Sequence, residues 1–191
     1  MYGYISKKNN GGNMTKETNT YIWDKVKHTN PNFTKPFPAF GKTLTTIDPM
    51  YQIMIMTNQF GPVGEGWNYK VNYTYTDKVV FAEVSVAHKQ RHVHAIGYDT
   101  AVEEKTWDYY GPISSAQSLY KKNGALDDEA PKKAMTDALT KAFSHLGVSA
   151  DVFLGLFDNN KYVSDMKTKF AQEKPKVADT NLVNFEQKGK K

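Results

Sequence analysis

The chain of 191 residues contains no cysteine. Disulfide frameworks, thiolate zinc sites and cysteine nucleophiles are therefore excluded. The sequence also lacks an apolar run near the roughly 20 residues that a membrane-spanning helix needs, and its first residues, MYGYISKKNNGGN, lack the apolar centre of a signal peptide. These absences predict a cytoplasmic protein that has no membrane partner.

Arginine is almost absent as well, because Arg91 is the only one among 25 basic residues. Bidentate recognition of guanine usually uses arginine, whereas lysine contacts phosphate as a point charge. The net charge is +5 and the chain has 12 tyrosines. Lysines mixed with aromatic rings are typical of surfaces that bind single-stranded nucleic acid without reading its sequence. Half-buried strand positions explain most of the tyrosines equally well.

Apolar residues are scarce at the two ends of the chain. The whole sequence is only 39% hydrophobic, with a mean hydropathy of -0.64. Residues 1–18 are rich in Asn, Lys, Thr and Gly, and residues 171–191 are rich in lysine without apolar spacing. We expect two disordered tails, the second of them basic, around a single domain at residues 19–170.

Two helices are predicted with clear ends. The first lies between Asp48-Pro49 and Phe60-Gly61, with proline in the permitted first turn. The second begins after the acidic residues 127–129 and ends at Gly147. Its apolar residues recur at the spacing of one helical stripe, namely Met135, Ala138, Leu139, Ala142, Phe143 and Leu146. Shorter helices are expected near residues 21–26 and 161–170, and the prolines at 31, 36 and 38 predict an extended or turning segment.

Alternating residues predict the strands. Residues 67–75 alternate between apolar and polar side chains, and residues 79–87 place a valine-rich face on one side. A third strand is expected at residues 91–98, and residues 99–124 are expected to form a long loop. Short connections favour an antiparallel meander. The predicted fold class is α+β: a β-β-β-α core in which the meander packs on the long helix.

Nucleotide-binding loops are not supported by the glycines of the sequence. Gly41-Lys42-Thr43 matches the end of a phosphate loop, but the earlier glycine would fall at Pro36 and no strand precedes it. Gly61, Gly64 and Gly66 lead into a strand, whereas a dinucleotide loop opens a helix. The sequence therefore predicts neither a nucleotide cofactor nor ATP use.

The histidines permit one enzymatic alternative. His88, His92 and His94 lie close together, but their neighbours Lys89 and Arg91 are basic and no carboxylate is near. A solvated strand end explains them more simply than a metal site does. No set of nucleophile, base and orienting group stands out. We therefore expect a protein that is not an enzyme and has no cofactor, with a metal-dependent enzyme as the alternative.

Four segments carry a family resemblance. They are Ile47-Asp48-Pro49, the block FGPVGEGW at 60–67, Ile96-Gly97-Tyr98 and above all residues 130–162, APKKAMTDALTKAFSHLGVSADVFLGLFDNNKY. In this order they resemble the Rad-fifty-two-like single-strand annealing proteins, specifically their small phage members. The resemblance covers about residues 40–165.

The resemblance implies a function and partners. It implies copies that assemble into a ring or filament, hold single-stranded DNA in a basic groove on the rim and anneal complementary strands in recombination without ATP. It further implies a phage exonuclease or a host single-strand-binding protein as a partner, and the host cytoplasm as the location if the chain is phage-encoded. A general single-strand coating protein is the alternative, although only three strands, and not the five of an oligonucleotide-binding fold, precede the long helix.

The resemblance also implies where the DNA would lie. The family's basic positions on the long helix fall at Thr140, Lys141 and Ser144, and one on the preceding helix falls near Tyr51, so only Lys141 keeps its charge. Lys132 and Lys133 are expected to compensate from the same helix, although helix lysines are often simply solvated. From charge and aromatic character, a basic sheet beneath that helix is expected to complete the groove. The DNA-binding candidates are Lys141, Lys132, Lys133, Arg91, Lys89, Lys70, Tyr69 and Tyr51.

Overall fold

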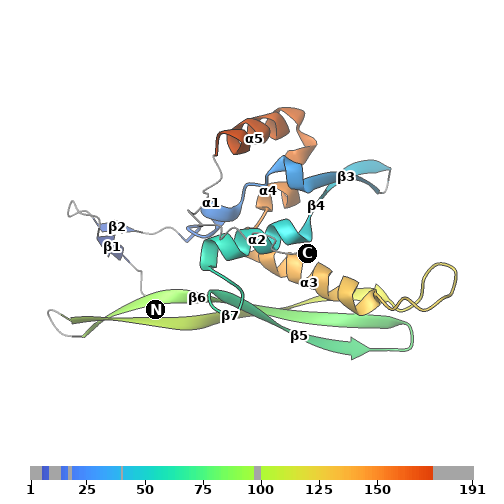
Figure 1. Cartoon of the computed structure of the whole chain (residues 1–191), viewed down its shortest axis with the longest axis horizontal. Coiled ribbons are helices and arrows are strands. Elements are labelled where there is room, and N and C mark those ends of the chain that lie inside the picture. The colour runs from blue at the N-terminus through green and yellow to red at the C-terminus, as the bar shows by residue number, and fades with distance from the viewer. Residues whose placement is uncertain (1–5, 9–13, 17–18, 40, 97–99, 174–191) are drawn as a thin grey trace, which may run out of the picture.

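A three-stranded antiparallel sheet forms the base of the molecule (Figure 1). The computed structural model describes residues 6–8, 14–16, 19–39, 41–96 and 100–173. The sheet consists of β5 (Trp67–Tyr75), β6 (Val79–Ile96) and β7 (Thr100–Ser118), in the order β5-β6-β7. The predicted α+β class, with an antiparallel meander packed on a long helix, is confirmed.

The third strand differs from the prediction. β6 runs without interruption to Ile96, so the separate strand expected at 91–98 is wrong, and β7 occupies most of the segment expected to be a loop. The sequence pattern did not predict β7, because two of its positions that face α3, Ser115 and Gln117, are polar. These two residues pair with Ala82 and Val80 of β6. A register shift between Val84 and Val86 also breaks the alternation opposite residues 111 and 112.

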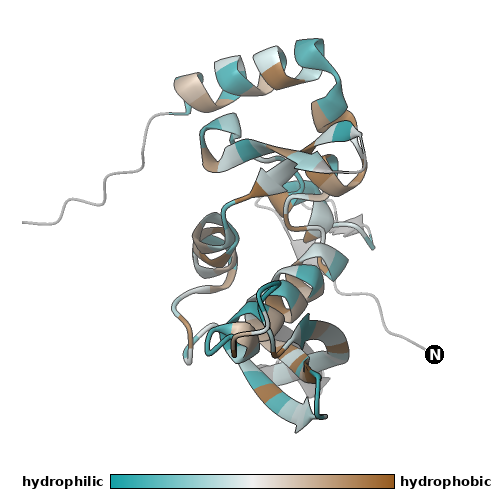
Figure 2. Cartoon of the chain, turned by 90° about the vertical axis from the view of Figure 1, so that its right-hand side faces the viewer, coloured by the Kyte–Doolittle hydropathy of each residue, from teal (hydrophilic) through white to brown (hydrophobic). Residues whose placement is uncertain are grey.

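The long helix α3 (Ala130–His145) lies across one face of this sheet, as both views show (Figures 1 and 2). Its apolar stripe is confirmed and packs on the valine-rich face of β6, where Val80, Ala82, Val84 and Val86 have no exposed surface. The ring of Phe143 meets Trp67 of β5 edge-on, with centroids 5.4 Å apart. The core of the protein is this layer between α3 and the sheet.

Helix α2 (Pro49–Phe60) joins the sheet through a tight glycine turn. Asp48 caps the helix, since its carboxylate accepts a hydrogen bond of 2.8 Å from the amide of Met50. The helix ends at Gly61, whose φ of 105° is open to glycine alone. A side chain at Gly66 would collide with the carbonyl oxygen of Phe60, so the chain entering β5 passes directly against the helix end. The expected helix and the glycine turn into a strand are confirmed.

Smaller elements form a second tier above α3 (Figure 2). They are α1 (Trp23–Val26), the 3-10 helix η1 (Pro31–Phe33), the hairpin β3 (Thr34–Ala39) and β4 (Lys42–Ile47), α4 (Ala150–Phe153), the 3-10 helix η2 (Leu156–Asp158) and α5 (Asn160–Gln172). A buried carboxylate ties these elements together. Asp151 accepts hydrogen bonds from the Thr29 amide at 2.8 Å and from the Tyr162 hydroxyl at 3.0 Å. Of the three prolines predicted to lie in an extended or turning segment, Pro31 begins η1, and Pro36 and Pro38 lie in the extended strand β3.

The two ends of the chain are described only in part. Within residues 1–18, the strands β1 (Ser6–Lys8) and β2 (Met14–Lys16) pair with each other, and the rest of the predicted tail lies outside the described residues. The predicted basic tail also lies outside them from residue 174 onward. Among the helices that the structure describes, none combines the length and apolar character needed to cross a bilayer.

Candidate functional site

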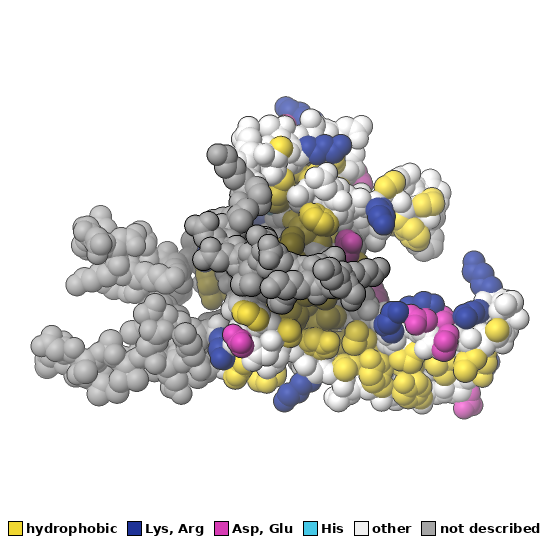
Figure 3. All heavy atoms as spheres, viewed as in Figure 1, with side chains coloured by type: hydrophobic (Ala, Val, Ile, Leu, Met, Phe, Trp, Pro, Cys, Tyr) yellow, Lys and Arg dark blue, Asp and Glu magenta, His cyan; other side chains and the backbone are white. Residues whose placement is uncertain are grey.

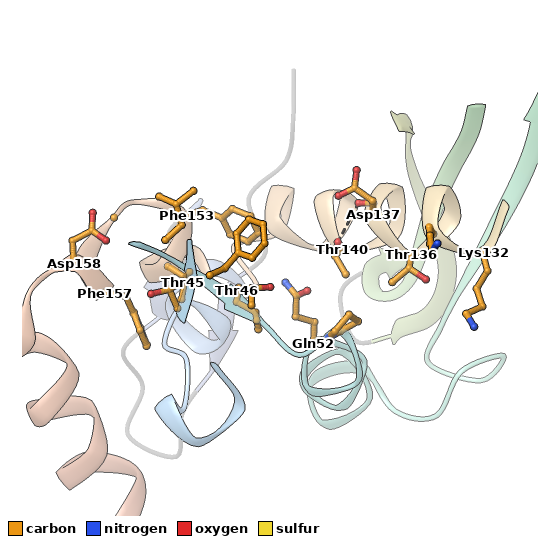
Figure 4. Close-up of a pocket in the computed structure, with 17 residues that line it drawn as sticks. Thr45, Thr46, Gln52, Lys132, Thr136, Asp137, Thr140, Phe153, Phe157 and Asp158 are labelled. Atoms are coloured by element: carbon orange, nitrogen blue, oxygen red, sulfur yellow. Dashed lines mark hydrogen bonds between the residues drawn. The ribbon is translucent and has the colours of Figure 1, made fainter. Parts of the chain in front are cut away.

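A cleft of about 750 Å³ separates the outer face of α3 from the second tier. Figure 4 shows α3 on one side, with α2 and β4 opposite. The lining residues come from six elements and the turn between the last two: Phe37, Leu44, Thr45, Thr46, Ile47, Pro49, Gln52, Lys132, Lys133, Thr136, Asp137, Thr140, Val152, Phe153, Gly155, Phe157 and Asp158. This volume is in the range of about 300 to 1,000 Å³ that small-molecule sites occupy.

The two ends of the cleft differ in chemistry (Figure 4). At one end, α3 contributes two lysines with Thr136 and Thr140, which supply charge and hydroxyl groups. At the other end lie Phe153, Phe157 and Asp158 (Figure 4). Phe153 and Phe37, which also lines the cleft, leave 56% and 53% of their surface exposed. Exposed aromatic rings beside basic and hydroxyl groups suit a ligand that has both anionic and flat apolar parts.

Each predicted lysine of α3 has a carboxylate partner. The pairs are Lys132 with Glu129, Lys133 with Asp127 at 2.6 Å, and Lys141 with Asp137 at 2.7 Å. On the face shown in Figure 3, basic and acidic side chains alternate at the end where α3 begins, above a band of hydrophobic side chains. The helix surface is therefore close to electrically neutral, and an anion bound here must displace carboxylates from the lysines.

Two carboxylates that pair with lysines of α3, Asp127 and Asp137, have pKa values below the ordinary value of 3.8. The hydrogen bond from Lys133 lowers the pKa of Asp127. Burial alone would raise the pKa of Asp137, but hydrogen bonds from Lys141 and Ser115 outweigh burial and lower it. Both carboxylates are thus ionised at neutral pH and hold their lysines in place.

Lys141 lies beside the cleft and does not line it. The cleft is lined instead by Thr140, the adjacent position that carries no charge, together with Lys132 and Lys133. Ser144 donates a hydrogen bond to the Lys141 carbonyl oxygen at 2.7 Å. Of the three α3 lysines predicted to bind DNA, the structure brings two into the cleft.

The sheet lysines lie on the face of the sheet that points away from α3. Strand alternation sends Lys70 and Lys89 to the side opposite the buried valines, where Lys70 lies 5.0 Å above the Tyr109 ring and Lys89 lies 5.1 Å above the Trp107 ring. The expected single groove that combines helix and sheet lysines is therefore wrong. The reason is that neighbouring residues of a strand point to opposite faces of the sheet, so a lysine one position along the strand lies on the other face.

The two predicted tyrosines have different environments. Tyr69 is on the helix side of the edge strand β5 and is 37% exposed, in line with Tyr73 and Tyr75. Tyr51 is only 6% exposed; its hydroxyl accepts a 3.0 Å hydrogen bond from the Asn30 amide and its ring stacks on Phe33. Burial raises the pKa of the Tyr51 hydroxyl. As placed in this structure, Tyr51 is a core residue and cannot contact DNA.

The basic and histidine positions of β6 are described in part. Arg91 pairs with Lys105 in the ladder, and its side chain lies outside the described residues, as do those of His92 and His94. His88 is 4% exposed and stacks on Phe60 with ring centroids 4.6 Å apart. Among the described side chains, no group of three or more His, Asp or Glu is placed to hold a metal ion.

Gln52 is a site residue that the sequence predictions did not include. It projects from α2 into the cleft between Thr46 and Thr140 (Figure 4), and it is only 1% exposed. Its amide nitrogen is buried and has no hydrogen-bond partner among the described residues. The signal was a polar residue four positions before the buried Met56, inside an otherwise apolar helix.

No family model matches the chain, and a search of curated proteins finds no match. The resemblance to single-strand annealing proteins therefore rests on the sequence motifs and stays a prediction.

Proposed function

We propose that this chain is a single-stranded DNA-binding protein that anneals complementary strands, without ATP, as a homo-oligomer. The observation that carries the proposal is the cleft, because it combines two lysines, several hydroxyl groups and exposed phenyl rings. Lysines and hydroxyls bind phosphates, and aromatic rings stack on unpaired bases whatever the sequence. Duplex DNA offers no free base faces, so the cleft favours single strands.

Annealing requires a strand that is held by its backbone and keeps most bases free to pair. Lys132, 67% exposed, can exchange its exposed carboxylate partner for a phosphate at modest cost, since exposed ion pairs contribute about 0 to 1 kcal/mol. Lys133 is paired with the buried Asp127 and is held more firmly. Base pairing then supplies the driving force, at about 1.4 kcal/mol per stacked step. No nucleotide hydrolysis is needed.

The homo-oligomer is supported by the edges of the sheet. β5 and β7 form its two edges, and among the described residues each is paired on one side only. Unpaired strand edges attract further strands, and β5 adds the exposed rings of Tyr69, Tyr73 and Tyr75 beside its edge. We propose that β5 of one copy meets β7 of the next, which extends the sheet from copy to copy into a ring or filament.

Binding and annealing of fluorescent oligonucleotides test the proposal. Lys132→Ala with Lys133→Ala should weaken binding to single strands and slow annealing of complementary strands in the absence of ATP. A control with the same loss of charge is Lys161→Ala with Lys167→Ala, since both lysines are exposed on α5 outside the cleft. Equal effects of the two double variants would refute the cleft as the DNA site, and binding without acceleration of annealing would identify a coating protein. A light-scattering mass of 21.6 kDa at all concentrations would refute the oligomer.

A further inference from the structure

Gln52 occupies a position where the fold alone calls for an apolar side chain. It lies on the buried side of α2, with Met56 one turn further on and fully buried. Its amide nitrogen has neither solvent contact nor a hydrogen-bond partner among the described residues. A buried donor without an acceptor destabilises a protein, and nearly all such groups in native structures are satisfied. A ligand that brings an acceptor atom into the cleft would satisfy it.

The surroundings of Gln52 indicate what kind of ligand this is. Ile47, Leu44 and the rings of Phe37 and Phe153 line the same cleft, so the ligand must present apolar surface as well as an acceptor. A bare phosphate would lose its hydration among these side chains. A nucleobase has both features, since its faces stack on aromatic rings and its edge carries carbonyl or ring-nitrogen acceptors.

The lysines fix how such a base would be attached. Lys132 lies at the opposite end of the cleft from Phe153 (Figure 4), as expected for a ligand whose anionic part lies apart from its flat part. A nucleotide within a DNA strand has this form, with phosphates on either side of the base. The cleft volume of about 750 Å³ is sufficient for one nucleotide.

We propose that the cleft takes one unstacked base per protomer, which stacks against the phenyl side chains and accepts a hydrogen bond from the Gln52 amide. This inference rests on the proposed function and adds to it the mode of contact. One base at each protomer is held inward, and the bases between protomers stay free to pair. The inserted base keeps the strand in place along the oligomer and must leave the cleft before pairing is complete.

The test compares oligothymidylate with an abasic oligonucleotide of the same length and phosphate number. Wild-type protein should bind the oligothymidylate about tenfold more tightly, the effect of stacking and hydrogen bonding one base. Gln52→Met keeps the length of the side chain and removes the amide, so it should reduce this preference several-fold. The melting temperature should stay equal or rise, because an unsatisfied buried donor has been removed. Asn58→Ala, on the exposed side of α2, is the control and should change neither quantity.

The outcomes separate this inference from the proposed function. If wild-type protein binds both oligonucleotides equally, the base pocket is refuted while single-strand binding stands. If it binds neither, the proposed function fails and the pocket fails with it. If the preference exists but is unchanged in Gln52→Met, the role of Gln52 is refuted. Phe153→Ala keeps the test decisive should Gln52→Met fail to fold, because this exposed ring can be removed without opening the core; a preserved preference there would refute the pocket.

Discussion

The two sides of α3 show how one helix serves the fold and the site at once. On the sheet side, Ala134, Ala138, Ala142 and Phe143 are at most 1% exposed, and three of these four are alanines that let the helix lie close to the strands. On the cleft side, α3 presents lysines, threonines and an aspartate, so basic, acidic and uncharged polar side chains lie next to one another. The four side chains named on the first side have no polar atoms to satisfy, whereas every charge on the second has a described partner.

The difference separates stability from binding along a single element. Changes on the sheet side should act on the free energy of unfolding, because they alter the packing of fully buried side chains. Changes on the cleft side should act on the affinity for DNA and leave the fold intact. Substitutions on either side test this separation.

Phe143→Ala should have the largest effect, a loss of about 3 to 5 kcal/mol in the free energy of unfolding, because a fully buried ring leaves a cavity. Denaturant titration followed by circular dichroism measures it. The matched control is Phe153→Ala, the same change at a ring that is 56% exposed, which should cost far less. Similar losses at the two positions would show that burial against the sheet gives Phe143 no more weight in stability than an exposed ring has on the neighbouring helix α4.

Ala138→Leu should destabilise by about 1 to 3 kcal/mol, since Ala138 has no exposed surface and the larger side chain would press α3 away from β6. Lys141→Leu introduces the same residue on the same helix at an exposed position and should be nearly neutral. The thermal midpoints of the two variants give the comparison. If Ala138→Leu melts at the wild-type temperature, the close approach of helix and sheet is not limited by packing.

Lys132→Ala should change the free energy of unfolding by less than about 0.5 kcal/mol, because its side chain is 67% exposed. Its effect should appear in the salt dependence of DNA binding. The slope of log affinity against log salt concentration should fall by about 0.7, the value for one lost phosphate contact with a single strand. An unchanged slope would show that Lys132 does not meet phosphate.

Asp137→Asn should have the smallest effect, on the pH dependence of stability. The pKa of Asp137 is lowered in the folded state, so the ionised carboxylate stabilises the fold above its ordinary pKa of 3.8, and this contribution is lost as pH falls through the lower folded value. Its side chain is 52% exposed, which limits the contribution to about 0.5 kcal/mol. Wild type should therefore lose slightly more stability than Asp137→Asn between pH 5 and pH 2. Parallel curves would contradict this assignment.

The elements with regular hydrophobic spacing were predictable from the sequence. The residue range of α2, the strand at 67–75 and the apolar stripe of α3 agree with the structure because one face of each is buried. β7 was not predictable, because the positions that it turns toward α3 include Ser115 and Gln117. Ser115 donates a hydrogen bond to Asp137 of α3, so a polar contact replaces the apolar one that a pattern search requires.

The candidate site was predictable in part. Lys132 and Lys133 line the cleft, and both had been predicted to bind DNA from their position on the long helix. Lys70 and Lys89 do not, because residue type says nothing about which face of a sheet the register selects. Gln52 was not predicted, because a single polar residue inside an apolar run has no evident role in the sequence. Its role became visible only from its burial and from the lack of a described hydrogen-bond partner for its amide nitrogen.

The glycine turn between α2 and β5 has a consequence for tracing the ancestry of this chain. Surface lysines can drift or change places during evolution, but a side chain at Gly66 would strike the backbone of Phe60, and Gly61 adopts a positive φ. Trp67 follows at once and is 1% exposed in the core. Distant relatives that keep this junction should therefore share the spacing Phe-Gly-x4-Gly-Trp even after their basic residues have diverged, which makes it a more durable signature of common descent than the charges of the cleft.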